Sequence, residues 1–575
     1  AQNRTEYFLV MGNVYVAGYT TSSSGIASGG FQNTFGGSQD AFLVKFNSVG
    51  TRQWATYYGG ASNDQGLSVA TDALGNVYLA GYTFSISGIA SGGFQNSYGG
   101  GPNDAFLVKF DATNGNRMWA TYYGGTGFDQ GNSVSADASG NVYLAGVTTS
   151  LSGIASGGFQ NTFGGVQDAF LVKFDAGSGN CLWATYYGGS GAETGGYIAA
   201  DVPGNIYLTG QTPSVSGIAS GGFQNTYGGG LNDAFLVKFS NLGNVLWAGY
   251  YGGTNNDWGY SVATDFLGNV FLAGKTMSSS GIASGGFQNV YNAGPTDVFL
   301  VKFNSSGSRL WATYYGETNI EEMGGVSTDT SGNAYLVGES YITSGLASGG
   351  FQNTLLGTEN AFVAKFDAGG NRMCATYYGQ DHEEDPHIAV DGFGNVFLIG
   401  TTASTAGMAS GGFQDTFGGA MDTYLVKFSS CTNPLSTTII STNINCNGAC
   451  TGMGTTFPAG GIGPYTYSWN TIAVQTTQTA TGLCAGVYTV TITDNMNSTT
   501  IATVTITQPS PLTSTIPVAT NVLCKGECTG NATANASGGT PSYTYLWSNG
   551  QTTAVTTSLC SGSYTVTVID TNGCI

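Results

Sequence analysis

Charged side chains are scarce in this chain. Only 8% of its 575 residues are charged, and 14 Lys and Arg stand against 33 Asp and Glu, for a formal net charge of −19. Such a balance repels the phosphates of nucleic acid and of anionic lipid, so neither is an expected partner. The surface must be wetted mainly by Ser, Thr, Asn, Gln and Gly, which is typical of exported proteins.

Long apolar runs are also missing. No stretch approaches the roughly 18 consecutive apolar residues that a membrane-spanning helix needs, so membrane insertion is not expected. No basic-then-apolar signal peptide is present, and the opening Ala1-Gln2-Asn3 fits what a signal peptidase leaves. We therefore interpret the sequence as that of a mature, soluble, exported chain.

Proline is rare, with 12 residues, whereas glycine reaches 93 and aromatic residues make up 13%. This mixture suits many short strands joined by tight turns better than it suits a flexible linker. An all-β fold is the expectation.

A long internal repeat sets the fold. The string Gly-Gly-Phe-Gln occurs seven times at intervals of 62 to 65 residues, and each unit carries four strand-like segments, such as 75–81, 104–110, 119–125 and 133–137. Four short strands bounded by Gly and Asn turns make one propeller blade, and seven copies close a ring. The repeated phenylalanines are Phe31, Phe94, Phe159, Phe223, Phe287, Phe351 and Phe413.

Closure is favoured over an open solenoid because the copies are incomplete in a complementary way. The first copy lacks its leading strand and the last lacks its trailing strand. The segment Thr5 to Val10 is placed to supply a ring-closing strand, and the sequence leaves open which gap it fills.

Residues 1–430 resemble the SBBP family of bacterial β-propeller repeats through the segments 75–81, 104–110 and 120–125. A further likeness is to the Trp-docking repeats of quinoprotein-type propellers, in which an Asp, a turn Gly and a Trp close each blade, as in Asp111, Gly115 and Trp119. This likeness gives a structural role to Trp54, Trp119, Trp183, Trp247 and Trp311, whose slot is taken by Cys374 in the sixth repeat.

The periodicity stops after Phe428, and two shorter copies follow. Cys446, Cys450, the segment 465–469 and Cys484 recur 76 to 78 residues later. Alternating Thr and Val strands with a Trp and Cys staples suit small extracellular β-sandwiches. The full expectation is all-β: a seven-bladed β-propeller (1–430) plus two small immunoglobulin-like β-sandwich modules (431–510 and 511–575).

The two modules are similar to SprB repeats, which are strung along large surface adhesins of gliding bacteria and are exported by the type IX secretion system. The resemblance implies an extracellular, bacterial cell-surface location. It also implies further repeats and a sorting domain, so we expect the sequence to be a fragment of a longer polypeptide.

Eight of the ten cysteines lie between residues 431 and 575, which in an exported chain indicates disulfides. The expected bridges are Cys450–Cys484 and Cys528–Cys560, with Cys524–Cys574 in the second module and Cys446 reaching Cys431. Zinc at Cys446 and Cys450 is the disfavoured rival, because no second ligand pair completes a tetrahedral site.

Two sets of side chains are candidate metal ligands. His382 and His387 lie in the acidic segment 381–387, and a solvated acidic turn is the alternative interpretation. A repeated Asp precedes each Gly-Asn turn, so closure would place these residues in a ring that could hold Ca²⁺, or each could simply cap its own turn. The ring comprises Asp72, Asp137, Asp201, Asp265, Asp329 and Asp391.

One lysine recurs inside an apolar strand, where an unpaired ammonium is costly, so a structural ion-pair ring is expected. The lysines are Lys45, Lys109, Lys173, Lys238, Lys302, Lys365 and Lys427. The partners predicted from the sequence include Asp40, Asp104, Asp168, Asp233, Asp297 and Asp422.

No set of nucleophile, base and orienting group is visible, so the expectation is a non-catalytic protein without cofactor. The favoured function is a secreted cell-surface adhesin or surface-assembly component, with the propeller as binding or display head and the modules as stalk. Polysaccharide or another surface protein is the expected partner, with self-assembly as a further mode. The alternatives are a purely structural filament or coat subunit and a carbohydrate-active propeller enzyme of lyase or sialidase type.

Overall fold

The chain folds into two compact units, Ala1–Cys431 and Thr432–Ile575. A computed structural model describes residues 12–292, 294–341, 345–391, 394–428, 435–460, 464–494 and 499–575, and the backbone of 6–10. All regular structure in these ranges is β-strand. With no helix among them, they contain no helix able to cross a membrane.

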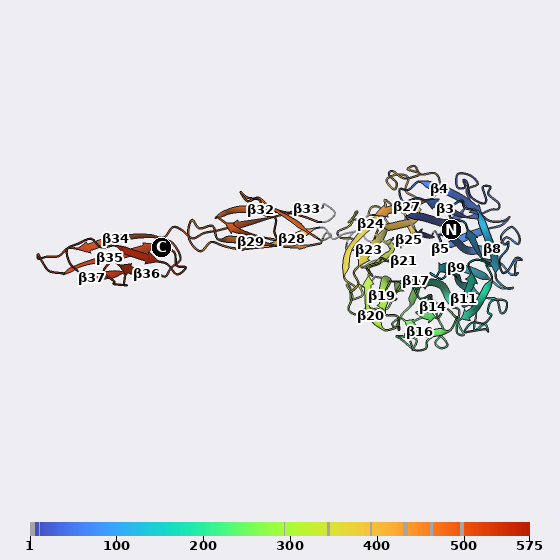
Figure 1. The fold of residues 1–575 in the computed structure, drawn as a ribbon. Helices are drawn as coiled ribbons and strands as arrows, with labels where there is room; N and C mark the ends of the chain where they lie inside the picture. The colour runs from blue at the N-terminus through green and yellow to red at the C-terminus, as the bar shows by residue number, and fades with distance from the viewer. Residues whose placement is uncertain are drawn as a thin grey trace. The chain divides into compact units, whose positions relative to one another are not determined.

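The described part of the first unit forms seven sheets around a central axis (Figure 1). Blades one and two are β1 (Glu6–Val10), β2 (Asn13–Thr20), β3 (Asp40–Phe46), β4 (Arg52–Tyr58), and β5 (Asp64–Thr71), β6 (Val77–Thr83), β7 (Asp104–Phe110), β8 (Arg117–Tyr123). Blades three and four are β9 (Asp129–Ala136), β10 (Asn141–Thr148), β11 (Asp168–Asp175), β12 (Cys181–Tyr187), and β13 (Thr194–Ala200), β14 (Ile206–Thr212), β15 (Asp233–Phe239), β16 (Val245–Tyr251). Blades five, six and seven are β17 (Asp257–Thr264), β18 (Val270–Thr276), β19 (Asp297–Phe303), β20 (Arg309–Tyr315); β21 (Glu321–Thr328), β22 (Ala334–Ser340), β23 (Asn360–Phe366), β24 (Arg372–Tyr378); and β25 (Glu383–Val390), β26 (Val396–Thr402), β27 (Asp422–Phe428).

The middle strands of blades one to six are largely buried on both faces, whereas β27 of blade seven is mostly half-buried or exposed. Every residue of β7 is buried, and so are six of seven in β6. Such strands are apolar without alternation because a blade packs against a neighbour on each side. This is why the repeated segments 75–81 and 104–110 lack the polar and apolar alternation of a half-exposed sheet.

The ring closes through its first strand. β1 pairs with β2 and becomes the innermost strand of blade one, while blade seven has three strands in its described part. Each innermost strand contacts the next, and β1 contacts β25. Val14 and Val16 share one apolar cluster with Phe397 and Ile399 of blade seven. The sequence left the position of this strand open, and the structure assigns it to the first blade.

The long connection between the second and third strands covers the outer edge of its own blade. In blade two, Ser91 and Gln95 bridge to Ala120 and Tyr122 of β8. Covering an outermost strand in this way blocks edge-to-edge pairing with another chain.

The second unit contains two β-sandwich modules, each built around a buried tryptophan. Module one has β28 (Ser436–Thr442), β29 (Gly452–Ala459) and β31 (Thr479–Leu483) in one sheet, and β30 (Thr466–Trp469), β32 (Gly486–Thr493) and β33 (Thr499–Ile506) in the other. Module two has β34 (Thr513–Thr520), β35 (Gly530–Ser537) and β37 (Val555–Leu559), with β36 (Thr544–Trp547) and β38 (Val566–Ile569) opposite. Trp469 and Trp547 lie in the two cores. The immunoglobulin-like topology stays a prediction.

Candidate functional site

The repeated aspartates lie in the turn between the first two strands of a blade. Asp72 accepts hydrogen bonds from the backbone N–H groups of Leu74 (3.0 Å) and Asn76 (2.9 Å) and from the hydroxyl of Tyr78 (2.9 Å). The Asn76 side-chain amide donates a fourth, at 2.8 Å. The carboxylate is therefore used within its own turn. The bond from the following Asn amide recurs at Asp137, Asp201, Asp265, Asp329 and Asp391.

These aspartates are not gathered into a metal site in the described ranges. No group of three or more His, Cys, Asp or Glu side chains placed to hold a metal ion occurs there. Each Asp is turned into its own blade, so the described ranges show no shared ring of metal ligands, and they show no assembled metal site at His382 and His387. Calcium binding stays a prediction.

Four of the seven repeated lysines form ion pairs with these turn aspartates in the described structure. Lys109 Nζ lies 3.9 Å from Asp72 Oδ2, and equivalent pairs lie 3.3 to 3.7 Å apart. The sequence predicted Asp104 as the partner, and this is wrong. Asp104 and Lys109 stand near opposite ends of β7, whereas Lys109 is opposite Tyr78, whose hydroxyl binds Asp72. The equivalent pairs are Lys238–Asp201, Lys302–Asp265 and Lys365–Asp329.

The tryptophans join neighbouring blades. Trp119 Nε1 and Lys109 Nζ both donate to the carbonyl oxygen of Ala176 in the next blade, at 3.0 and 2.8 Å. A β-carbon on Gly179 would stand 2.8 Å from the Trp119 ring, so this turn requires glycine. Trp54 contacts Gly115 in the same way, which shows that the motif links two blades and does not close the blade that carries it. The same contact joins Trp183, Trp247 and Trp311 to Gly243, Gly307 and Gly370.

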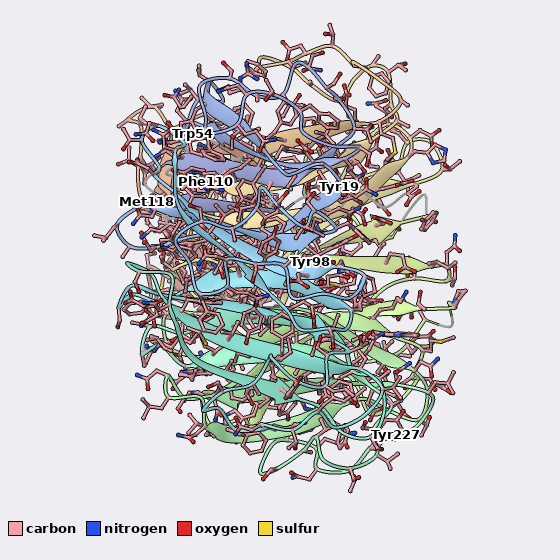
Figure 2. The ribbon with its side chains drawn as sticks, turned by 90° about the vertical axis from the view of Figure 1, so that its right-hand side faces the viewer. Tyr19, Trp54, Tyr98, Phe110, Met118 and Tyr227 are labelled. Atoms are coloured by element: carbon pink, nitrogen blue, oxygen red, sulfur yellow. A yellow bond between two sulfur atoms is a disulfide. The ribbon has the colours of Figure 1, made fainter. Side chains whose placement is uncertain are left out.

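A set of buried carboxylate pairs lies between blades. In each pair, an outer acid at the start of the third strand of one blade faces an inner acid at or next to the start of the first strand of the next blade. Asp104 of β7 and Asp129 of β9 are both fully buried. Asp104 Oδ1 and Asp129 Oδ2 lie 2.7 and 2.8 Å from the point where a β-carbon on Gly124 would stand. Asp129 accepts three hydrogen bonds, whereas Asp104 Oδ1 has no hydrogen-bond partner. Burial raises the pKa of Asp104 to about 7. In Figure 2, Tyr227 lies on the side of the propeller opposite Trp54, and the neighbouring Gly228 of its loop donates to Asp233.

One natural substitution indicates the charge state of these pairs. At the junction of blades six and seven Asn360 replaces the outer acid, and its Nδ2 donates to Glu383 Oε2 at 2.9 Å. An amide is the neutral isostere of a protonated carboxyl, so the substitution favours a neutral outer acid elsewhere. The sequence carries a signal for these pairs, because an acid precedes and another acid follows the repeated Tyr-Tyr-Gly, as Asp104 and Asp129 do around Gly124. The other pairs are Asp40–Asp64, Asp168–Glu193, Asp233–Asp257 and Asp297–Glu321.

The sixth repeat breaks the symmetry with a cluster of acids. His382 Nδ1 lies 3.9 Å from Glu359 Oε2, and the hydroxyl of Tyr341 donates to Glu359 Oε1 at 2.6 Å. Burial and the neighbouring Glu359 raise the pKa of Glu339 to about 9. His382 and Asp385 have φ values of 57° and 50°, a left-handed backbone that costs non-glycine residues energy. The other histidine, His387, lies within β25 opposite Ile399.

The seven repeated phenylalanines form an exposed rim. Their exposed fractions run from 39% at Phe31 to 78% at Phe351. Arg117 of the next blade stacks on Phe31 at 4.5 Å, and equivalent arginines cover Phe223, Phe287 and Phe413. The repeated Gln, by contrast, points inward: Gln95 Nε2 donates to Asp104. The Phe of this connection is therefore a surface group and the Gln a structural one.

The disulfides agree with the sequence at two bridges and differ at the third. Cys450–Cys484 and Cys528–Cys560 are formed. Cys574 bonds to Cys446 of the first module, so the predicted Cys524–Cys574 bridge is wrong and Cys524 is a free, exposed thiol. Cys446 is thereby taken, and its predicted partner Cys431 lies outside the described residues.

Comparison with known families identifies the repeats of the propeller and the repeats of the second unit. Residues 53–85, 119–151 and 246–282 match the beta-propeller repeat SBBP, and residues 438–474 and 516–552 match the SprB repeat. The chain contains SBBP β-propeller repeats and two SprB repeats. The resemblances to SBBP and SprB repeats drawn from the sequence are confirmed. SprB repeats and disulfides fit an extracellular or cell-surface protein of adhesin type.

Similar proteins were found in sequence and in structure. An uncharacterized WD repeat-containing protein of Acanthamoeba polyphaga mimivirus is 24% identical over 363 residues, which are 52% of this chain and 26% of that protein. The chain thus spans about a quarter of the curated relative. The polysaccharide lyase Uly1 covers 74% of this chain and 89% of its own (TM-score 0.38, 10% identity). The β-propeller domain of the Trilobed protease from Pyrococcus furiosus covers 70% and 90% (TM-score 0.35, 7% identity).

Proposed function

We propose that this protein is a secreted, non-catalytic bacterial surface adhesin, with the propeller as its binding head and the SprB modules as a stalk. The observation that carries the proposal is one chain holding two disulfide-stapled SprB repeats and a propeller with an exposed phenylalanine on every blade. Type IX export belongs to the same proposal.

Polysaccharide is the proposed ligand of the rim. An aromatic ring offers a flat apolar face to a sugar ring, and neighbouring amides can bind its hydroxyls. Each rim phenylalanine is followed by Gln and then by Asn or Asp, with Asn33 exposed beside Phe31. Seven weak, equal sites on one rigid ring would reach useful avidity through effective concentration.

The test is a glycan and cell-wall polysaccharide binding assay on the units 1–431 and 432–575, each with calcium and with chelator. The decisive variant replaces Phe94, Phe159 and Phe351 by Ser, because no arginine stacks on these three in the described structure. We expect binding by the propeller unit alone and a loss of tenfold or more in the variant.

The matched control replaces Leu74 and Leu267 by Ser, since these are 88% and 80% exposed and lie in the turns between the first two strands of blades two and five, outside the connections that carry the phenylalanines. Equal loss in variant and control would remove the rim from the proposal. If neither unit binds glycan, a protein partner or self-assembly into a coat becomes the better account, and sedimentation of the full chain tests the latter.

The acid cluster of blade six supports a second candidate, a carbohydrate-active enzyme. Burial and the neighbouring Glu359 raise the pKa of Glu339, which favours its protonated form, so this carboxyl can act as a general acid. The hydroxyl of Tyr341 donates to Glu359 in the same cluster. Glu339→Gln and Glu359→Gln should then abolish any cleavage of a bound polysaccharide. If no bound polysaccharide yields new reducing ends or unsaturated products, the enzyme candidate is excluded and the adhesin remains the proposed function.

A further inference from the structure

The two SprB modules carry equivalent loops at one end. Loop 443–450 in module one and loop 521–528 in module two each begin with Asn and contain two cysteines four residues apart. In each, a backbone N–H three residues on donates to the carbonyl of the first cysteine, at 3.1 Å for Cys446 and 3.2 Å for Cys524. The second cysteine of each loop is bonded within its own module. Cys446 and Cys524 are therefore the same position in two copies.

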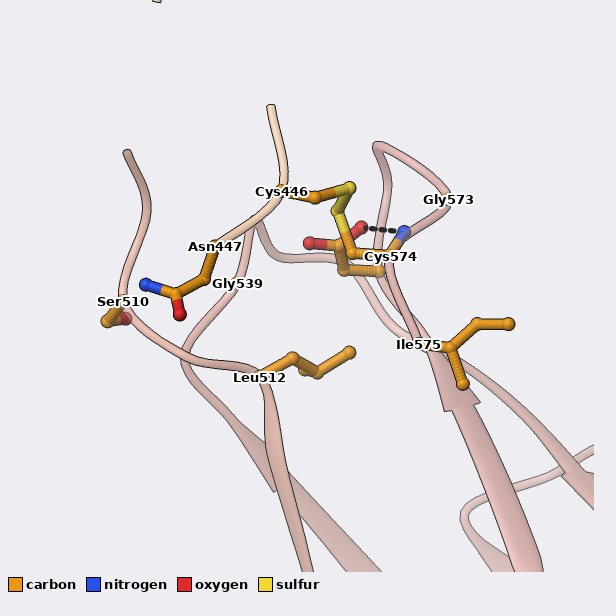
Figure 3. A pocket seen from close by; sticks show the side chains of 9 residues that line it. Cys446, Asn447, Ser510, Leu512, Gly539, Gly573, Cys574 and Ile575 are labelled. Carbon is orange, nitrogen blue, oxygen red and sulfur yellow. Dashed lines mark hydrogen bonds between the residues drawn. A yellow bond between two sulfur atoms is a disulfide. The ribbon is translucent and has the colours of Figure 1, made fainter. Parts of the chain in front are cut away.

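In module one this loop is bonded to the terminal turn of module two. Cys446 is bonded to Cys574, with 5.5 Å between their α-carbons (Figure 3). The side-chain amide of Asn572 donates to the carbonyl of Asn445 at 3.2 Å, and that of Asn447 donates to Pro509 at 2.9 Å. The contact thus combines one covalent bond with a hydrogen bond from the short terminal turn, and the loop also donates a hydrogen bond to the linker between the modules.

That turn is preformed by its own aspartate. Asp570 Oδ1 accepts from the backbone N–H groups of Asn572 and Cys574, both at 2.9 Å. A cleft of about 300 Å³ lies between the turn and the loop, lined by Asn447, Leu512 and Cys574 among others. The sequence Asp-Thr-Asn-Gly-Cys therefore presents its thiol in a fixed geometry.

The same loop is bare in module two. Cys524 is a free, exposed thiol, and Leu523 beside it is 88% exposed. In module one the position equivalent to Leu523 is Asn445, whose backbone carbonyl accepts the hydrogen bond from Asn572. Among the described residues, the disulfide and the hydrogen bond that the terminal turn makes with the loop of module one have no counterpart at the loop of module two.

The positions of the cysteines in the sequence agree with a bond from the terminal cysteine of one module back to the loop of the module before it. Counting from the shared aspartates Asp494 and Asp570, the position of Cys574 is a serine, Ser498, in the first module. The first module follows the propeller and has no SprB module before it to bond. The second follows a module and carries the terminal cysteine that bonds backward.

We propose that Cys524 is the bonding site for the terminal cysteine of a further module of this kind, placed in series after the second. The incoming turn would carry Asp-x-Asn-Gly-Cys, its Asn amide would donate to the Leu523 carbonyl, and its thiol would meet Cys524 Sγ. Joining the two thiols releases two protons and two electrons, which a small-molecule disulfide accepts as it is reduced to two thiols. This goes beyond the adhesive role and does not depend on what the propeller binds.

The test extends the full chain by a second copy of residues 500–575, in which the residue equivalent to Cys524 is Ser so that peptides are unique. The copy supplies a strand like β33, the linker and a module with its terminal cysteine. After refolding with oxidised glutathione, we expect maleimide labelling of Cys524 to fall at least tenfold relative to the unextended chain. Mass spectrometry should find Cys524 bonded to the last cysteine of the copy.

The control is the same extension with its last cysteine replaced by Ser, in which Cys524 should label as in the original chain. Recovery of the Cys446–Cys574 peptide in each digest shows that the natural modules have folded. Full labelling of Cys524 in the extended chain would overturn the proposal. So would a Cys524 bond found only between separate chains on a non-reducing gel.

Discussion

At the scale of single residues, the buried acid pairs give the propeller a dependence on pH. Burial raises the pKa of Asp104, Asp233 and Asp297 to about 7, from an ordinary value of 3.8. Between those two pH values the folded chain holds protons that the unfolded chain releases. Stability from these groups is therefore full below pH 3.8 and is lost as the pH rises to about 7.

We expect Asp104→Asn to copy the natural Asn360 and to remove part of this loss. At pH 8 the midpoint of thermal unfolding should rise by about 2 °C or more, and at pH 4 it should be unchanged. Scanning calorimetry from pH 4 to 8 measures both. Asp415→Asn is the control, because Asp415 is exposed and the same position is Asn in most other repeats. A lower midpoint at every pH would show that Asp104 is needed as an acid.

At the scale of elements, the tryptophan near the start of the outer strand of blades one to five determines how each of these blades joins the next. Trp119→Ala removes a buried ring and its bond to Ala176, and large core truncations of this kind cost about 3–5 kcal/mol. We expect the urea midpoint of the propeller to fall accordingly. Met118→Ala changes the adjacent residue, which is 56% exposed, and should leave the midpoint within error.

The two sandwich modules should differ in their need for a disulfide. The core of module two is smaller, with Ala532, Ala534, Trp547 and Leu559 as its buried members. Replacing Cys528 and Cys560 by Ala should cost about 3 kcal/mol and expose amides around Trp547 to hydrogen exchange. The matched change at Cys450 and Cys484 should leave the larger core of module one folded. Equal loss of protection in both modules would contradict this ranking.

The repeat period and the four strands per unit were enough to predict the blades, because strand length and turn residues are local properties. The partner of Lys109 was not predictable from the pattern, since Asp72 and Asp104 both recur at fixed distances and only the register of β6 against β7 selects between them. The bond of Cys574 to Cys446 was missed for a related reason: the two modules were treated as closed units, and nothing local in the sequence shows a bond that spans them.

At the scale of the whole molecule, one strand completes the inner ring. Deleting residues 1–11 removes β1 and leaves β25 and β5 without the strand that both contact. We expect the thermal midpoint of the propeller to fall by about 5 °C or more and exchange to increase in β2. Deleting residues 432–575, which belong to the other unit, should leave the propeller midpoint unchanged. A β1 deletion without effect would mean that the ring is closed by packing of the other strands alone.

The place of β1 has a mechanical consequence. In the described structure blade one and blade seven are each built from their own stretch of chain, and they meet through side chains such as Phe46 and Phe413, whose rings lie 6.1 Å apart. No strand is shared across the seam among the described residues, so a sustained pull would separate blade seven from blade one before it unzipped any hydrogen-bonded sheet. The seam is thus where we expect a loaded propeller to yield first.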